Sequence, residues 1–259
     1  MNVDYIISKY LEKNKDKDEK NRFLQYHFFR PISFYVSHFL MKLDITANQA
    51  TYISILFGFC GLLFLTFGGY WNRIGGMVFL HFWLIMDNVD GNIARCQDTC
   101  TLYGKLIDIL NDQVFHFLFF CLGVGLFIKS DLFMGVVGRF SGVSSHLNLS
   151  VSLIILGAWA SMMSMMAGLV YQKFLSEFGK DISFDLDSKK IKGGTVSRIK
   201  LFFYLILRSS DTILPIFIVA CVMNYSSLLL VLYALLNTIL LFSLVFKFIQ
   251  MVRNYEGVN

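Results

Sequence analysis

The hydrophobic residues of this chain gather in long runs that short polar stretches separate. Leu, Ile, Phe and Val dominate these runs, and the whole sequence holds only 2 prolines. A helix needs about 20 apolar residues to cross a hydrocarbon core of roughly 30 Å, and the runs have that length. The pattern therefore predicts transmembrane helices rather than alternating barrel strands. We expect six of them, at about residues 49–69, 73–95, 102–128, 148–172, 199–223 and 226–250.

Charged residues interrupt the second and third predicted spans, which a simple hydropathy criterion would scarcely accept near this point. A charged side chain at the bilayer centre costs about 2.5–3.5 kcal/mol, so such residues mark functional sites. This stretch is therefore the first candidate for a functional site. The interrupting residues are Asp87, Asp90, Arg95, Lys105, Asp108 and Asp112.

The composition also indicates a membrane protein. With 56% hydrophobic residues, 16% aromatic residues and a mean hydropathy of +0.59, the chain is too apolar for an ordinary soluble domain. We expect an all-α fold in one polytopic domain, without a soluble module and without a nucleic-acid partner. The predicted parts are a charged cytoplasmic tail (1–22), an interfacial amphipathic helix (23–44), a six-helix domain (45–252) and a cytoplasmic C-terminal tail (253–259).

The N-terminal residues divide into two parts. Residues 1–22 are charged and lack an apolar core, so they predict a solvated, partly disordered segment rather than a signal peptide. The following stretch carries an apolar helical face opposite Ser33, Ser37 and His38, with Pro31 in its first turn. This pattern is typical of a helix that lies in the membrane interface. The apolar face consists of Ile32, Tyr35, Val36, Phe39, Leu40 and Leu43.

The basic residues predict the orientation. Lys and Arg gather before residue 43 and between residues 173 and 200, whereas the opposite loops hold only Arg73, Lys129 and Arg139. By the positive-inside rule, both termini and the 96–101 loop would face the cytoplasm. The aspartate-rich stretch would then face the cytoplasm too.

The aspartates follow helical spacing. Asp87 and Asp90 share a face with the small residues Gly91 and Ala94, and the third span repeats the scheme at four-residue spacing. If the two spans form an antiparallel hairpin, four carboxylates converge. Divalent cations such as Mg²⁺, Mn²⁺ or Ca²⁺ would offset their charge, and a pair of metals fits this number of oxygen ligands. The third-span residues are Gly104, Asp108 and Asp112.

Two readings of the aspartates compete with a metal site. They could form salt bridges, although Arg95 and Lys105 would partner only two of them. They could also line the water-filled vestibule of a cation-coupled transporter. Neither reading explains why Gly and Ala recur at fixed offsets from the acids.

The stretch resembles the signature of the CDP-alcohol phosphatidyltransferases, D-x-x-D-G-x-x-A-R-x8-G-x3-D-x3-D. Every fixed position matches, namely Asp87, Asp90, Gly91, Ala94, Arg95, Gly104, Asp108 and Asp112. The family has six transmembrane helices, an N-terminal amphipathic helix and a site at the cytoplasmic surface. The segment "ITANQAT" (45–51) resembles the family's entry to the first span, except that Ala47 replaces a proline. That exchange puts the local turn in doubt.

The resemblance implies an enzyme that transfers a phospho-alcohol unit from a CDP-linked donor to an acceptor hydroxyl and releases CMP, in phospholipid or related glycoconjugate synthesis. It implies two divalent cations, Mg²⁺ or Mn²⁺, on Asp87, Asp90, Asp108 and Asp112, with Asp112 as general base. It also implies a homodimer, and a bacterial cytoplasmic membrane fits the chain. The implied donor-binding residues are Asn48, Thr51, Gly91, Ala94, Arg95 and Gly104.

The substrates stay open at this point. CDP-diacylglycerol is our first choice of donor, and a soluble CDP-alcohol used on a lipid or polyol acceptor is the alternative. Arg208 lies within the fifth predicted span, where an arginine without compensation would be costly. It either pairs with an acid such as Asp211 or binds an anionic acceptor.

Overall fold

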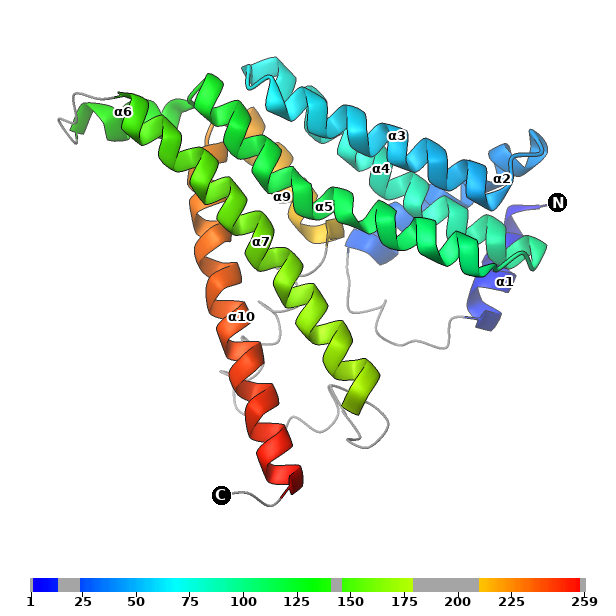
Figure 1. Cartoon of the computed structure of the whole chain (residues 1–259). Coiled ribbons are helices and arrows are strands. Elements are labelled where there is room, and N and C mark those ends of the chain that lie inside the picture. Colours follow the sequence, from blue (N-terminus) through cyan, green and yellow to red (C-terminus); the bar gives the residue numbers. More distant parts are fainter. Residues whose placement is uncertain (1, 14–23, 141–145, 179–209, 257–259) are drawn as a thin grey trace.

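The structure is a computed structural model, and it describes residues 2–13, 24–140, 146–178 and 210–256. Every element in these ranges is a helix (Figure 1). The elements are α1 (Val3–Lys13), η2 (Gln25–Phe29), α2 (Arg30–Lys42), α3 (Ala47–Thr66), α4 (Tyr70–Gln97), α5 (Leu102–Ile128), α6 (Leu132–Phe140), α7 (His146–Phe178), α9 (Ser210–Val222) and α10 (Ser226–Glu256).

The prediction of an all-α integral membrane protein is confirmed. Four helical segments in the described part are long and apolar enough to cross a membrane: Ala47–Thr66, Leu102–Ile128, Val151–Val170 and Ser226–Gln250. The 28-residue helix α4 is not among them, because its charged C-terminal half lowers its hydropathy. α5 qualifies in spite of its aspartates, since the residues after Asp112 are almost all apolar.

The count of six spans stays a prediction. α9 is an apolar helix of 13 residues, which is short for a crossing on its own. The first part of the predicted fifth span, residues 199–209, lies outside the described residues. The short helix α6 was not anticipated from the sequence.

Four helix–helix contacts dominate the architecture. α3 packs along α4 and α5, while α7 packs along α5 and α10. In Figure 1 the start of α5 and the end of α7 diverge, so α7 and α10 lean away from the end of the molecule where α1 and α2 lie. The start of α3, the end of α4 and the start of α5 meet at that α1–α2 end (Figure 1). This is where the charged stretch of the sequence is brought together.

Glycines set the closest helix contacts. A Cβ atom on Gly157 of α7 would lie 2.6 Å from the Phe119 carbonyl oxygen and 3.0 Å from the Gly123 Cα of α5. A Cβ atom on Gly61 of α3 would lie 3.0 Å from the Gly76 carbonyl oxygen of α4. Small residues at such crossings are typical of membrane helices, whose association depends on van der Waals packing.

Buried polar contacts tie the connections at the opposite end. Arg73 donates to the carbonyl oxygens of Gly68 and Lys129, both at 2.9 Å, and to Asn224 Oδ1 at 2.6 Å. One side chain therefore links the α3–α4, α5–α6 and α9–α10 connections. Burial of a charged group is tolerated where hydrogen bonds compensate it.

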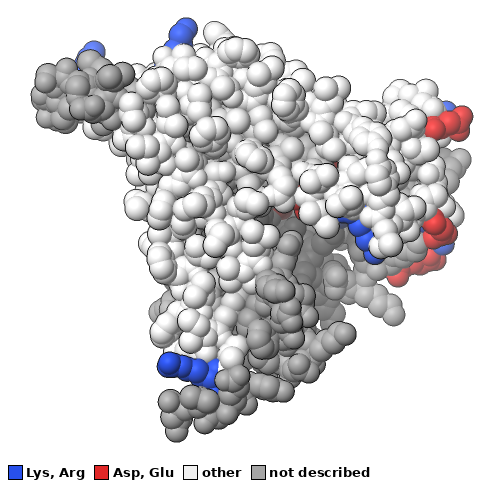
Figure 2. Space-filling view, viewed as in Figure 1, with Lys and Arg blue, Asp and Glu red and all other residues white. Residues whose placement is uncertain are grey.

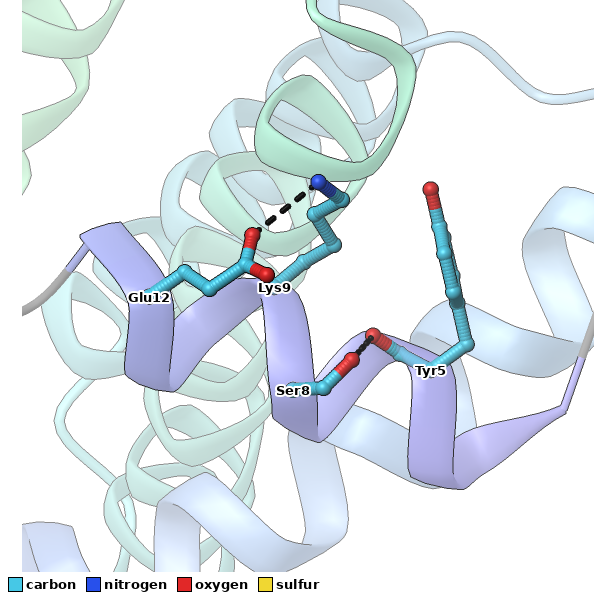
Figure 3. Close-up of polar contacts among 4 residues, drawn as sticks. All are labelled: Tyr5, Ser8, Lys9 and Glu12. Carbon is cyan, nitrogen blue, oxygen red and sulfur yellow. Dashed lines mark hydrogen bonds and ion pairs between the residues drawn. The ribbon is translucent and has the colours of Figure 1, made fainter.

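The N-terminal residues differ from the sequence prediction. The expected solvated segment over residues 1–22 instead contains helix α1, while residues 14–22 lie outside the described part. Ile6 and Tyr10 of α1 are buried against Phe34 of α2. Figure 3 shows polar contacts within α1, where the Lys9 ammonium lies 3.0 Å from Glu12 Oε2. The helix is amphipathic, and the charge count of the segment concealed its buried face.

Helix α2 turns its small polar side toward the protein. Asn92 of α4 donates to the hydroxyl oxygens of Ser33 at 3.0 Å and Ser37 at 3.2 Å. The apolar residues Tyr35 and Phe39 on the other side are exposed, and Pro31 occupies the first turn as expected. Figure 2 shows a largely uncharged face over the helices, with acidic side chains near the α1–α2 end.

Candidate active site

A single cavity of about 290 Å³ collects most of the residues singled out in the sequence. α3 contributes its first two turns, α4 its C-terminal half, and α5 its first two turns. The α4–α5 connection closes one side, and α2 adds one arginine. The lining residues are Arg30, Ala47, Asn48, Thr51, Asp87, Asn88, Asp90, Gly91, Ala94, Arg95, Thr99, Cys100, Thr101, Gly104, Lys105 and Asp108.

Three of the four aspartates form a compact group. Carboxylate oxygens of Asp87, Asp90 and Asp108 lie within 4.8 Å of one another. The antiparallel α4–α5 hairpin produces this approach, because it opposes the last turns of α4 to the first turns of α5. Asp112 lies one turn farther along α5, is exposed, and belongs neither to this group nor to the cavity lining.

Neutral donors hold two of these carboxylates in place. Thr51 Oγ1 donates to Asp90 Oδ2 at 2.6 Å, and Asn111 Nδ2 donates to Asp87 Oδ1 at 2.7 Å. Both donors are uncharged side chains, and the charge of Arg95 adds an electrostatic attraction to the Asp90 carboxylate. The salt-bridge interpretation of these acids stays an alternative.

The donor set fits divalent metal ions. Three carboxylates within 4.8 Å repel one another in a partly buried setting, and a cation would offset that repulsion. Hard oxygen ligands select cations such as Mg²⁺, Mn²⁺ or Ca²⁺ rather than softer metals. Asn111 and Thr51 orient the Asp87 and Asp90 carboxylates, as outer hydrogen bonds would do if a metal bound there.

The start of α3 forms a regular helix entry without the proline. Thr46 is the N-cap, its hydroxyl accepts from the Gln49 amide at 3.4 Å, and Gln49 Oε1 accepts from the Thr46 amide at 2.9 Å. This capping box supplies the turn that Ala47 had put in doubt. Asn48 and Thr51 both face the cavity as a result.

The glycines of the signature leave room inside the cavity. A Cβ atom on Gly104 would lie 3.3 Å from Asn48 Oδ1 and 3.3 Å from Thr101 Oγ1. A Cβ atom on Gly91 would lie 3.1 Å from Arg95 Nη2. A larger side chain at either position would reduce the space between the polar groups.

Sequence reasoning missed several residues of the site. Asn111 is fully buried, accepts from Trp83 Nε1 at 2.8 Å and donates to Ser54 Oγ at 3.2 Å, so it links three helices. Its position between two aspartates in an apolar helix was the available signal. Arg30 also lines the cavity, and its place beside Pro31 gave no hint of that.

Arg208, the tentative acceptor-binding residue, lies outside the described residues. Its expected partner Asp211 is buried at the start of α9. The two interpretations of Arg208 therefore stay open. Lys105 is a further cation at the cavity, on the first turn of α5.

Comparisons with known proteins agree with the signature. The family model described as CDP-alcohol phosphatidyltransferase matches residues 44–249. A curated relative, the "Bifunctional IPC transferase and DIPP synthase" of Aquifex aeolicus (strain VF5), is 29% identical over 111 residues. That alignment covers 43% of this chain and 25% of the relative, so the chain spans about a quarter of that protein's length.

Proposed function

Because this chain belongs to the CDP-alcohol phosphatidyltransferase family, we propose that it transfers a phospho-alcohol group from a CDP-linked donor to an acceptor hydroxyl and releases CMP. The observation that carries the proposal is the group of Asp87, Asp90 and Asp108 in a cavity shared with Arg95. We take CDP-diacylglycerol as the donor and lipid synthesis as the context. The Aquifex relative, named as a transferase and synthase, is consistent with group transfer.

In the proposed reaction the acceptor hydroxyl oxygen forms a bond to the donor phosphorus that carries the alcohol unit. The phosphorus–oxygen bond to CMP breaks, and CMP leaves with the electron pair of that bond. Asp112 takes the acceptor's proton as general base. Its place outside the cavity suits an acceptor that approaches along α5 while the donor occupies the cavity.

The other residues bind and orient the donor. Arg95 supplies a fork of N–H donors for phosphate oxygens. Asn48 and Thr51 offer polar groups near the cytidine, and Gly91, Ala94 and Gly104 leave space for the diphosphate.

Two divalent cations, Mg²⁺ or Mn²⁺, would be held by Asp87, Asp90, Asp108 and Asp112. When bound, they would supply positive charge to the diphosphate.

The proposed setting is a bacterial cytoplasmic membrane with the cavity facing the cytoplasm, and the proposed assembly is a homodimer. The basic residues of the N-terminal segment and of 173–200 support this orientation. A soluble CDP-linked substrate would reach the cavity from that side.

The test is CMP release by purified protein in detergent or nanodiscs, with Mg²⁺ and CDP-diacylglycerol. A screen of glycerol phosphate, inositol, inositol phosphate, serine, choline and diacylglycerol would identify the acceptor. Diacylglycerol with CDP-linked amino alcohols tests the alternative donor class. If no donor–acceptor pair gave CMP, the transferase assignment would fail, and cation-coupled transport would become the reading to test.

A further inference from the structure

Tyr10 of helix α1 brings two arginines of the cavity together. The Arg30 Cζ atom lies 4.8 Å from the centre of the Tyr10 ring, and the Arg95 Cζ atom lies 5.5 Å from it. Both distances are within the range of cation–π contacts. Arg30 comes from the start of α2 and Arg95 from the end of α4, so one ring joins two separate elements.

The ring itself is held firmly. Tyr10 is 7% exposed and packs edge-to-face on Phe34 of α2, with the ring centres 5.4 Å apart. Ile6 anchors the same side of α1 in the same cluster. The position of the ring therefore depends on the docking of α1 against α2 and α4.

Two guanidinium groups on one ring form a site of concentrated positive charge. An anion in the cavity that both arginines line would be attracted by both charges. A guanidinium that rests on an aromatic face retains N–H donors for a bidentate contact with phosphate oxygens. Both arginines line the cavity that holds Asp87, Asp90 and Asp108, so the anion would lie beside these three carboxylates.

We propose that Arg30 and Arg95, gathered on Tyr10, form a subsite that binds the diphosphate of the CDP-linked donor. Arg30 contacts the ligand, and Tyr10 is a positioning residue that acts through both arginines. The inference rests on the proposed function and goes beyond it, because Tyr10 and Arg30 both precede residues 44–249 that match the family. Helix α1 thus becomes part of the substrate site.

The diphosphate is favoured over an acceptor phosphate for two reasons. Arg95 lies over Gly91, on the same face of α4 as Asp87 and Asp90. The cavity of about 290 Å³ also has room for a compact charged group between the arginines and the carboxylates. A diphosphate carries enough negative charge to contact the two arginines and the metal ions at the same time.

The experiment measures CDP and CMP binding by calorimetry in Mg²⁺ with full-length protein, alongside the KM for the CDP-linked donor. Arg30→Gln and Tyr10→Leu are expected to weaken CDP binding by roughly tenfold or more, the usual effect of losing a charge-assisted hydrogen bond. CMP, which has one phosphate, should lose less affinity. Tyr10→Phe keeps the ring and should bind CDP as the unaltered protein does.

Tyr5→Leu is the matched control, since Tyr5 is an exposed ring on the same helix (Figure 3). It should leave CDP binding unchanged. If Tyr10→Leu fails to fold, Arg30→Gln tests the subsite independently.

The subsite is overturned if folded Arg30→Gln binds CDP within twofold of the unaltered protein. It is likewise overturned if Arg30→Gln raises only the KM of a phosphorylated acceptor, which would assign the arginines to that substrate instead. A Tyr10→Phe variant as defective as Tyr10→Leu would overturn the positioning role of the ring. Absence of CMP release by the unaltered protein would defeat the proposed function, while Arg30-dependent CDP binding would still support the subsite.

Discussion

The Asn111 side-chain amide donates to Asp87 Oδ1 at 2.7 Å and so joins α5 to the Asp87 carboxylate on α4. The same side chain accepts from Trp83 Nε1 and donates to Ser54 Oγ, so its orientation is determined on three sides. Asp87 is therefore held in position before any ligand binds.

Asn111→Leu should raise the Mg²⁺ concentration needed for half-maximal activity by about 10- to 100-fold, as loss of an outer hydrogen bond does in metal sites. The reason is that the Asp87 carboxylate would lose its orienting donor. Activity titrated with Mg²⁺ checks this, with Gln113→Leu as the control. Gln113 is a neighbouring amide on α5 that bonds the Ile109 carbonyl instead of an aspartate. A lower melting temperature with an unchanged Mg²⁺ requirement would limit Asn111 to a structural role.

Removal of divalent cations should abolish transfer. Three carboxylates within 4.8 Å cannot position a diphosphate alone, because they repel it. CMP release measured in excess EDTA, then after addition of Mg²⁺ or Mn²⁺, checks this. Full turnover in EDTA would contradict the metal assignment.

Asp112→Asn should separate proton transfer from donor binding. The amide keeps the shape of the side chain but cannot accept the proton, so turnover should fall by about 10²- to 10⁴-fold while CDP binding is largely retained. Asp90→Ala should instead weaken metal and CDP binding together, since Asp90 is one of the three clustered carboxylates. Calorimetry and turnover on both variants provide the comparison. Near-normal turnover of Asp112→Asn would remove Asp112 as the base.

Arg208→Ala should raise the KM of the acceptor and leave donor affinity unchanged, if this arginine binds an anionic acceptor. The prediction follows from its sequence position within the fifth predicted span. Steady-state kinetics with each substrate varied in turn is the measurement. Loss of folding without that kinetic pattern would instead favour a structural pairing.

Gly157→Ala should destabilise the protein by about 1–3 kcal/mol, because an overpacked contact forces neighbouring backbone to shift. The added Cβ atom would lie 2.6 Å from the Phe119 carbonyl oxygen, where α7 crosses α5. Gly135→Ala is the control, since a Cβ atom there would meet nothing within 4 Å outside its own stretch of helix. Thermal unfolding in detergent should show a lower melting temperature for Gly157→Ala alone.

The sequence by itself determined the class of the fold and the family. Apolar runs of membrane-spanning length predict helices because lipid offers no partner for backbone polar groups. The eight signature residues from Asp87 to Asp112 also occur at fixed spacings, which can be recognised without any knowledge of packing. These features are local in the chain, so pattern alone reveals them.

Tertiary structure decided which residues share the cavity. Asn111 meets Asp87, and Tyr10 meets Arg30 and Arg95, only because helices distant in sequence pack together. It also decided that α1 docks on α2, which the charges of the N-terminal segment concealed. Such contacts depend on the relative rotation and separation of helices, and helical periodicity within one segment carries no information about either.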